Sequence, residues 1–234
     1  MNQPAVQAFD LLVYEDGIPM DDYRHVLQMH LLMQTVRQLM AERGRSDSFT
    51  AGNIFVYHSI EQARDVVRKR SNFRGPDFFV VDGVDPRPEE ERKAWVAWEE
   101  GGRLPDLIVE LLSPSTAEMD RTDKKDLYAQ VYRAREYYLY DMDAVELEGF
   151  RLAGDRYRPI RPDRQGRLRS EVLGLDLGLW HGVQDKQKAT WIRFYHPDGR
   201  LAPTVAEAER QRAEAAEAEV VRLRALLLER SGSR

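Results

Sequence analysis

PDLIVELLSPST, residues 105–116, is the most informative segment of this chain. It sets one carboxylate, Glu110, inside the apolar run Leu107–Leu112, and Ser-Pro-Ser-Thr ends that run. A short apolar run bounded by turn residues is typical of a strand that is buried on both faces. An ionised carboxylate there needs a cationic partner, a metal ion or a raised pKa. The segment therefore predicts a central strand that carries a functional group.

A second acid, Asp77, stands at the start of another apolar run. In GPDFFVVDGV, residues 75–84, only apolar side chains separate Asp77 from Asp82. Neighbouring strands lie about 5 Å apart, so Asp77 and Glu110 are able to meet across a sheet. Asp106 lies four strand residues, roughly 13 Å, from Glu110 and cannot share an ion with it in one straight strand. Asp77 and Glu110 are the predicted metal ligands; the alternative is that both are structural carboxylates at strand ends.

Composition narrows the kind of protein and the kind of ion. The chain has 234 residues, of which 42% are hydrophobic and 32% charged, which is enough for one sizeable core and an appendage. The sequence contains no cysteine, which excludes disulfides and thiolate metal sites. The five histidines lack the paired spacing of a zinc site. Oxygen ligands and a hard divalent cation, Mg²⁺ or Mn²⁺, are therefore expected.

Charge and hydropathy exclude other classes. The formal charge is −5, from 35 basic and 40 acidic residues, which gives no overall attraction to nucleic acid. No window approaches 18 apolar residues, and the N-terminus lacks the basic and apolar segments of a signal peptide. We expect a cytoplasmic protein without a membrane partner, in which any binding of nucleic acid is local.

Hydrophobic periodicity predicts an α+β chain. Residues 21–42 repeat apolar side chains at spacings of three and four, as an amphipathic helix does. A long helix is expected over residues 120–136. Trp95 and Trp98, three apart in a strand, are expected on opposite sides of a sheet. The strands are predicted at residues 53–57, 75–84, 93–99, 107–112 and 137–141, with short alternating strands over 147–195. The core order is therefore αβββαβ.

The composition changes after Pro203, where Ala, Glu and Arg predominate. We therefore divide the chain into a domain of residues 1–203 and a charged helical tail of residues 204–234. Residues that alternate spacings of three and four form an a/d seam of a little over two heptads: Ala213, Ala216, Val220, Leu223 and Leu227. The seam predicts a short coiled coil or a docked helix, and the alternative is a solvated helix that frays.

Five segments together resemble the Uma2 family, a branch of the PD-(D/E)xK restriction-endonuclease-like superfamily. They are GPDFFVV, VELLSPST, the trio Asp120, Lys124 and Tyr128, EYYLYD, and SEVLGLDLGLW. The resemblance covers about residues 9–203. It implies a restriction-endonuclease-like αβββαβ core with additional C-terminal strands, and hydrolysis of DNA phosphodiesters that depends on Mg²⁺ or Mn²⁺. It also implies that the backbone carbonyl of Leu111 is a further metal ligand.

The sequence departs from the superfamily pattern at the catalytic lysine. The position two residues after Glu110 holds Leu112, where the superfamily has lysine. On a helix with about 100° per residue, Lys124 points toward the core face and Lys125 points about 100° away. The resemblance implies that Lys124 is the migrated catalytic lysine. The alternative is a lysine whose stem covers apolar surface.

Three further residues are candidates for supporting roles. Asp120, one turn before Lys124, is able to pair with it or to cap the helix. Tyr128 follows Lys124 at i,i+4, where its hydroxyl could reach the same cavity, although such a tyrosine more often belongs to the core. Gln34, on the first helix, is the third candidate.

One basic segment is the local signal for nucleic acid. It carries five basic and two acidic residues between positions 61 and 74, directly before Asp77. A basic loop at the mouth of a metal site could hold phosphates, whereas many such runs are only solvated. The candidate DNA contacts are Arg64, Arg68, Lys69, Arg70 and Arg74.

These observations lead to one main hypothesis and two alternatives. The main hypothesis is a metal-dependent deoxyribonuclease in which Asp77 and Glu110 hold the ion and Lys124 is the cationic helper. We expect a homodimer or higher homo-oligomer, since two sites would act on two strands. The first alternative is a catalytically weak or inactive nuclease-fold module that binds DNA or protein. The second is a hydrolase of another phosphate ester.

Overall fold

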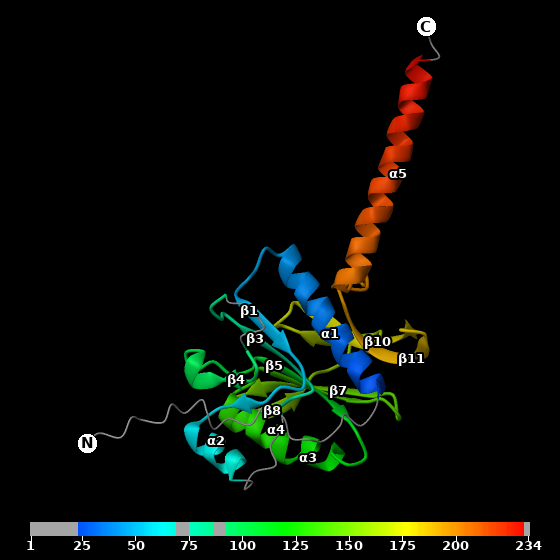
Figure 1. The fold of residues 1–234 in the computed structure, drawn as a ribbon. Helices are drawn as coiled ribbons and strands as arrows, with labels where there is room; N and C mark the ends of the chain where they lie inside the picture. Colours follow the sequence, from blue (N-terminus) through cyan, green and yellow to red (C-terminus); the bar gives the residue numbers. More distant parts are fainter. Residues whose placement is uncertain (1–22, 69–74, 87–91, 232–234) are drawn as a thin grey trace, which may run out of the picture.

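The computed structural model describes residues 23–68, 75–86 and 92–231 (Figure 1). A six-stranded mixed sheet has the order β1-β3-β5-β6-β7-β8, in which β5 and β6 are parallel and the other pairs antiparallel. Its strands are β1 (Ser48–Ala51), β3 (Phe78–Asp82), β5 (Leu107–Leu112), β6 (Glu136–Asp141), β7 (Glu146–Ala153) and β8 (Arg156–Pro159). The mixed sheet with flanking helices confirms the predicted α+β class.

Two smaller sheets complete the strands. A three-stranded sheet has the order β11-β10-β9, and a two-stranded parallel sheet joins β2 and β4. Their strands are β2 (Val56–Tyr57), β4 (Trp95–Val96), β9 (Leu168–Ser170), β10 (Leu175–Gln184) and β11 (Gln187–Tyr195). The helical segments are α1 (Tyr23–Glu42), α2 (Ile60–Val67), the 3₁₀ turn η3 (Ala97–Glu99), α3 (Ala117–Arg121), α4 (Asp123–Leu127), the π-turn η4 (Tyr128–Tyr132) and α5 (Val205–Ser231).

The central strand β5 is buried along its whole length, because a hydrophobic core lies on each face. On one face, Val109 and Leu111 pack in the core that includes Val36 of α1. On the other face, Ile108 and Leu112 pack in the core formed with the segment from α3 to η4. Since side chains alternate along a strand, Glu110 points toward that second face. The strand order and this alternation fix where the carboxylate lies.

Three predicted elements differ in the structure. Of the strand expected over residues 53–57, only Val56–Tyr57 forms a strand, and β1 precedes it at Ser48–Ala51. The helix expected over residues 120–136 is interrupted, since α3 ends at Arg121 and Thr122 leaves the helical region with φ −121° and ψ −91°. The Thr122 hydroxyl donates to the carbonyl of Glu118 at 2.7 Å, a local bond that competes with helix continuation. The expected strand over 93–99 ends at Val96, and Trp98 lies in a 3₁₀ turn. The prediction that Trp98 faces a sheet opposite Trp95 is therefore wrong.

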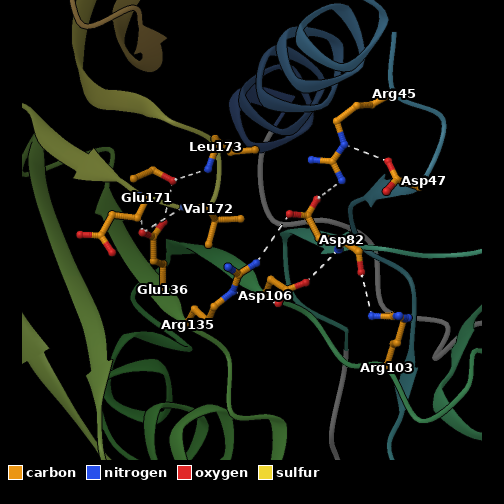
Figure 2. Close-up of polar contacts among 11 residues, drawn as sticks. Arg45, Asp47, Asp82, Arg103, Asp106, Arg135, Glu136, Glu171, Val172 and Leu173 are labelled. Atoms are coloured by element: carbon orange, nitrogen blue, oxygen red, sulfur yellow. Dashed lines mark hydrogen bonds and ion pairs between the residues drawn. The ribbon is translucent and has the colours of Figure 1, made fainter. Parts of the chain in front are cut away.

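Glu136, at the start of β6, joins the two larger sheets. Its carboxylate is buried and accepts hydrogen bonds from the Ser170 hydroxyl at 2.6 Å and from the Glu171 backbone N–H at 2.6 Å. The Tyr138 hydroxyl donates to it at 3.1 Å. Figure 2 shows this group beside the backbone of Val172. The carboxylate thus fixes the second sheet against the first.

None of the helices within the described ranges combines the length and apolar character that a membrane crossing needs.

Within the described part of the chain, the long helix α5 is fixed to the body at its base. Thr204 and Glu207 form a capping box, in which the Glu207 carboxylate accepts from the Thr204 N–H at 2.8 Å and the Thr204 hydroxyl accepts from the Glu207 N–H at 3.2 Å. Arg193 of β11, fully buried, donates to the same carboxylate at 2.6 Å. Beyond Ala208 the side chains through Leu228 are exposed, and Figure 1 shows the helix projecting from the body.

This anchor predicts a pH-dependent contribution to stability. Partial burial alone would raise the pKa of Glu207, but the hydrogen bonds from Arg193 and Thr204 outweigh it and lower the pKa. Because the folded-state pKa is depressed, the contribution is present above about pH 4.3, the ordinary glutamate value, and is lost as the pH falls through the folded value. We expect Glu207→Gln to lower the free energy of unfolding by roughly 1–3 kcal/mol at pH 7, and by less at pH 3.

Chemical denaturation of both proteins at the two pH values measures this difference. Glu209→Gln, on the exposed part of the same helix, is the matched control and should leave stability unchanged. An equal loss for Glu207→Gln at both pH values would contradict the ionic role of Glu207.

Candidate active site

Asp77 and Glu110 oppose each other at one end of the β3–β5 ladder. The antiparallel register pairs Phe78 with Val109, so the next position along each strand places Asp77 opposite Glu110. The Asp77 backbone N–H donates to Glu110 Oε2 at 3.3 Å, and the Leu111 N–H donates to Asp77 Oδ2 at 2.7 Å. Each carboxylate is therefore oriented by the backbone of the other strand.

Glycines allow a loop to approach the backbone that leads into Asp77. A Cβ on Gly75 would lie 1.5 Å from the carbonyl oxygen of Ile54, and one on Gly52 would lie 2.4 Å from the carbonyl oxygen of Asp77. The Asn53 N–H donates to the carbonyl of Pro76, at 3.1 Å, in the same crossing. Only a residue without a side chain fits at these two positions.

Lys124 reaches the same site from α4. Its Nζ lies 3.2 Å from Glu110 Oε1 and 2.6 Å from Asp120 Oδ1. The Lys124 side chain is 11% exposed, and the Glu110 and Asp120 side chains are each 1% exposed. Leu112 packs in the core on the same face, so the cation comes from the helix and not from the strand. The structure thus brings Lys124 beside Glu110, the residue that Asp77 opposes on the neighbouring strand.

A hydrogen bond from Tyr128 also orients the Glu110 carboxylate. Its hydroxyl donates to Glu110 Oε1 at 2.7 Å. Burial, followed by the charge of Glu110, raises the pKa of Tyr128 well above its ordinary value, so the hydroxyl keeps its proton and donates. Tyr128 begins the π-turn η4, a form of helix that is frequent at functional sites. Tyr137 of β6 supports the adjoining helix by donating to the carbonyl of Asp120 at 2.8 Å.

The site carries more negative than positive charge. Three carboxyl groups, Asp77, Glu110 and Asp120, surround one ammonium group, Lys124. Burial, opposed by Lys124 and strengthened by the nearby charges of Asp77 and Asp120, raises the pKa of Glu110 to about 8. Burial also raises the pKa of Asp77. Burial lowers the pKa of Lys124, but the three carboxylates outweigh that effect and raise it. A bound proton or an added cation would relieve the excess charge.

The donors fit a hard divalent cation that keeps part of its water shell. Within the described residues, no group of three or more acidic, histidine or cysteine side chains is arranged to enclose a metal ion. Asp77 and Glu110 are two opposed carboxylates, however, and Mg²⁺ is commonly held by one or two carboxylates together with water and substrate phosphate. The oxygen-only donor set also agrees with a chain that lacks cysteine.

Other predicted residues lie elsewhere or outside the described ranges. Gln34 is on α1, which packs on the opposite face of the sheet, and within the described part of the chain it makes no hydrogen bond to the site carboxylates. Arg64 and Arg68 are exposed, on α2 and at its C-terminal cap. Lys69, Arg70 and Arg74 lie outside the described residues.

Asp106 takes part in a separate network of ion pairs, at the other end of the β3–β5 ladder. It accepts from the Asp82 N–H at 2.8 Å and from Arg135 Nε at 3.0 Å, and Arg45 lies 3.5 Å from Asp82 (Figure 2). Asp106 thus has its own ion-pair partner, Arg135, at the end of the ladder opposite to Glu110.

Sequence reasoning missed two kinds of support for the site. Gly52 and Gly75 set the approach of the loop to Asp77, and Tyr137 fixes the carbonyl of Asp120. Gly75 precedes Pro-Asp, a turn signal that could have been noticed. Tyr137 lies in an ordinary apolar run, and nothing in its sequence context marks this hydrogen bond.

Comparisons with known proteins point to one family. The family model Uma2, described as "Putative restriction endonuclease", matches residues 17–184, which is more than half of the 234-residue chain. A search of the curated proteins found no match. A solved structure described as a "putative nuclease belonging to DUF820" from Anabaena variabilis ATCC 29413 is similar, with 14% identity, a TM-score of 0.45, and coverage of 68% of this chain and 81% of that chain. A structural similarity at this TM-score is too weak to support an inference about this chain. The family is therefore assigned from the family-model match alone.

The raised pKa of Glu110 predicts how stability depends on pH without metal. A glutamate in an unfolded chain titrates near pH 4.3, whereas folding raises the pKa of Glu110 to about 8. The folded state therefore binds more protons between these values, and stability falls as the pH rises through this window. In EDTA, we expect the free energy of unfolding of the wild type to fall relative to Glu110→Gln between pH 5 and pH 8, by on the order of 2 kcal/mol.

Urea unfolding at several pH values gives the comparison. Glu118→Gln, an exposed carboxyl on α3, is the control and should follow the wild type. A wild-type minus Glu110→Gln difference that does not change with pH would show that Glu110 is ionised throughout.

Proposed function

The chain belongs to the Uma2 family, as its motifs predicted, and on this premise we propose that it is a metal-dependent endonuclease that hydrolyses DNA phosphodiester bonds. The observation that carries the proposal is the cluster in which Glu110 opposes Asp77 across two strands and contacts Lys124 from a helix. Two carboxylates and a cation in one place are the groups that phosphodiester hydrolysis needs. The reacting centre would lie beside Asp77, which is partly open to solvent, while Glu110 is buried.

Asp77 and Glu110 would hold Mg²⁺ or Mn²⁺, with the Leu111 carbonyl as a further ligand. A bound divalent cation neutralises charge on the phosphate and lowers the pKa of water. The chain positions these ligands before any ion arrives, because the N–H groups of Asp77 and Leu111 already orient the two carboxylates. Binding of the ion would still require Lys124 to release Glu110 Oε1, from which its Nζ lies 3.2 Å.

Lys124 would stabilise the negative charge that develops on the phosphate oxygens. Its ammonium group stays protonated, since the surrounding carboxylates raise its pKa. Asp120, 2.6 Å from Nζ, holds the lysine at the site, so Lys124 can turn from Glu110 toward a substrate while it keeps one partner. Tyr128 would keep Glu110 in its orientation during that change.

DNA would approach over the basic segment that precedes Asp77. Arg64 and Arg68 are exposed there, and the segment carries a local positive charge on a chain whose formal net charge is −5. Phosphate contacts of this kind position a duplex without reading its sequence. We also propose that the protein acts in the cytoplasm as a homo-oligomer, which would bring two sites to the two strands of one duplex.

One observation favours a second candidate, a nuclease-fold module that binds DNA or protein without useful catalysis. Lys124 already forms ion pairs with both Glu110 and Asp120, so the cluster is partly neutralised by its own side chain. If this ion pair persists when metal is added, Glu110 is not available as a ligand. Metal binding and cleavage must therefore be measured separately.

The cleavage test uses neighbouring lysines as a matched pair. Lys124→Met removes the cation that contacts Glu110, and we expect plasmid cleavage in Mg²⁺ or Mn²⁺ to fall by at least about 100-fold. Lys125→Met is the control, because Lys125 Nζ lies over the ring of Phe150, 3.4 Å from its centroid, and not beside Glu110. Equal losses in both variants would argue against a specific role for Lys124.

Binding of Mn²⁺, followed by calorimetry, separates the two candidates. We expect the wild type and Lys124→Met to bind the ion, and Asp77→Asn and Glu110→Gln to lose at least about tenfold in affinity, as the loss of one charged ligand requires. Circular dichroism checks that each variant is folded. If the protein binds Mn²⁺ but cleaves neither double-stranded DNA, single-stranded DNA nor a simple phosphodiester, the binding module is favoured. Cleavage of the simple ester alone would indicate a substrate other than DNA.

A further inference from the structure

The exposed part of α5 carries an apolar stripe. From Glu209 to Leu228 every side chain of the helix is exposed, so the described residues of the body do not cover them. Among these, Val220 is 46% exposed, Leu223 47% and Leu227 66%. A long helix that lacks packing against its own domain is only marginally stable in water. A second helix against this stripe would bury it.

The stripe follows a heptad repeat. Ala213, Val220 and Leu227 occupy a positions, and Ala216 and Leu223 occupy d positions. A β-branched residue at a with leucine at d, as at Val220 and Leu223, favours two strands in parallel coiled coils. The residues at the flanking e and g positions then set the partner and the orientation.

The flanking charges fit a second copy of the same helix. In a parallel pair, each g residue faces the e residue five positions later in the partner. Here Arg212 at g would face Glu217, and Glu219 at g would face Arg224. Both contacts join opposite charges, and symmetry repeats each of them. We propose that α5 pairs with α5 of a second copy as a parallel, two-stranded coiled coil.

An antiparallel pair satisfies fewer charges. In an antiparallel pair, Ala216 at d would face Leu227 at a of the second copy, and e positions would face e positions. The opposite-charge contact in this alignment joins Glu217 to Arg224. The contact of Glu219 with Arg222 within one chain, at 2.7 Å, does not prevent the parallel pairing, because both groups are exposed and an exposed pair contributes little. Charge complementarity therefore selects the parallel orientation.

The base of the helix relates this pairing to the body. Glu207 is fixed to the buried Arg193, so each body sits at the N-terminal end of its helix. A parallel coil places both bodies at the same end, whereas an antiparallel coil would separate them by the length of the helix, about 40 Å for 27 residues. This inference does not depend on nuclease activity, and its test measures assembly alone.

Disulfide cross-linking tests the orientation, since the chain has no cysteine of its own. In a glutathione redox buffer, we expect full-length Ala216→Cys, at a d position, to form a covalent dimer of twice 27.2 kDa. Ala218→Cys, at an f position on the outer side of the coil, is the matched control and should stay monomeric in denaturing gels. Cross-linking of a mixture of Ala216→Cys and Leu227→Cys, without cross-linking of Ala216→Cys alone, would show an antiparallel pair and overturn the proposal.

A charge exchange gives an independent readout, by sedimentation of the cysteine-free proteins. Glu219→Arg should weaken the dimer, because the introduced arginine would face Arg224 of the second copy, and adding Arg224→Glu should restore it. In an antiparallel pair the double variant would stay weak, since the glutamate introduced at position 224 would face Glu217. A wild type that sediments as a monomer at all concentrations, or as a trimer, would also overturn the proposal.

Discussion

The burial of the Glu110 carboxylate in the middle of strand β5 determines which groups must surround it. Its burial raises its pKa, and the approach of Asp77 on the next strand raises it further. The surrounding groups compensate for this in part: Tyr128 donates to one oxygen, the Asp77 backbone donates to the other, and Lys124 supplies a positive charge. A buried charge persists only when it is paired and hydrogen-bonded, so the helix that carries Lys124 and Tyr128 must pack on this face.

The class of the fold could be predicted from the sequence, and the two acids that the sequence singled out lie opposite each other in the structure. Glu110 and Asp77 stand out because apolar side chains surround or follow them, and a carboxylate is costly in that setting. The register between the strands could not be read from the sequence, since a shift of one residue would have put Asp77 on the other face. Gln34 was predicted to face the site, but α1 lies on the opposite face of the sheet. Periodicity shows which side of a helix is buried, but not which face of the sheet the helix covers.

Glu136 shows the limit of the same argument. Like Asp77 it precedes an apolar run, yet its carboxylate is satisfied by donors from residues 170 and 171 and serves to join two sheets. Nothing near Glu136 in the sequence distinguishes this structural role from a metal ligand, because the partners that join the two sheets, Ser170 and Glu171, lie more than 30 positions away. The interruption at Thr122 was hidden in a similar way, since the residues on both sides of it favour helix.

Because Lys124 lies on a helix, its position is not tied to the spacing of residues along the strand that carries Glu110. A lysine two residues after the acid in one strand lies roughly 7 Å farther along it, and the spacing cannot change without a slip of the sheet. Here the chain leaves β5, turns through Ser113 and returns along α3 and α4. A change in the length of that turn would move Lys124 and Asp120 together and leave Asp77 and Glu110 in their places on the sheet. The acids and the cation are therefore free to diverge independently over evolutionary time.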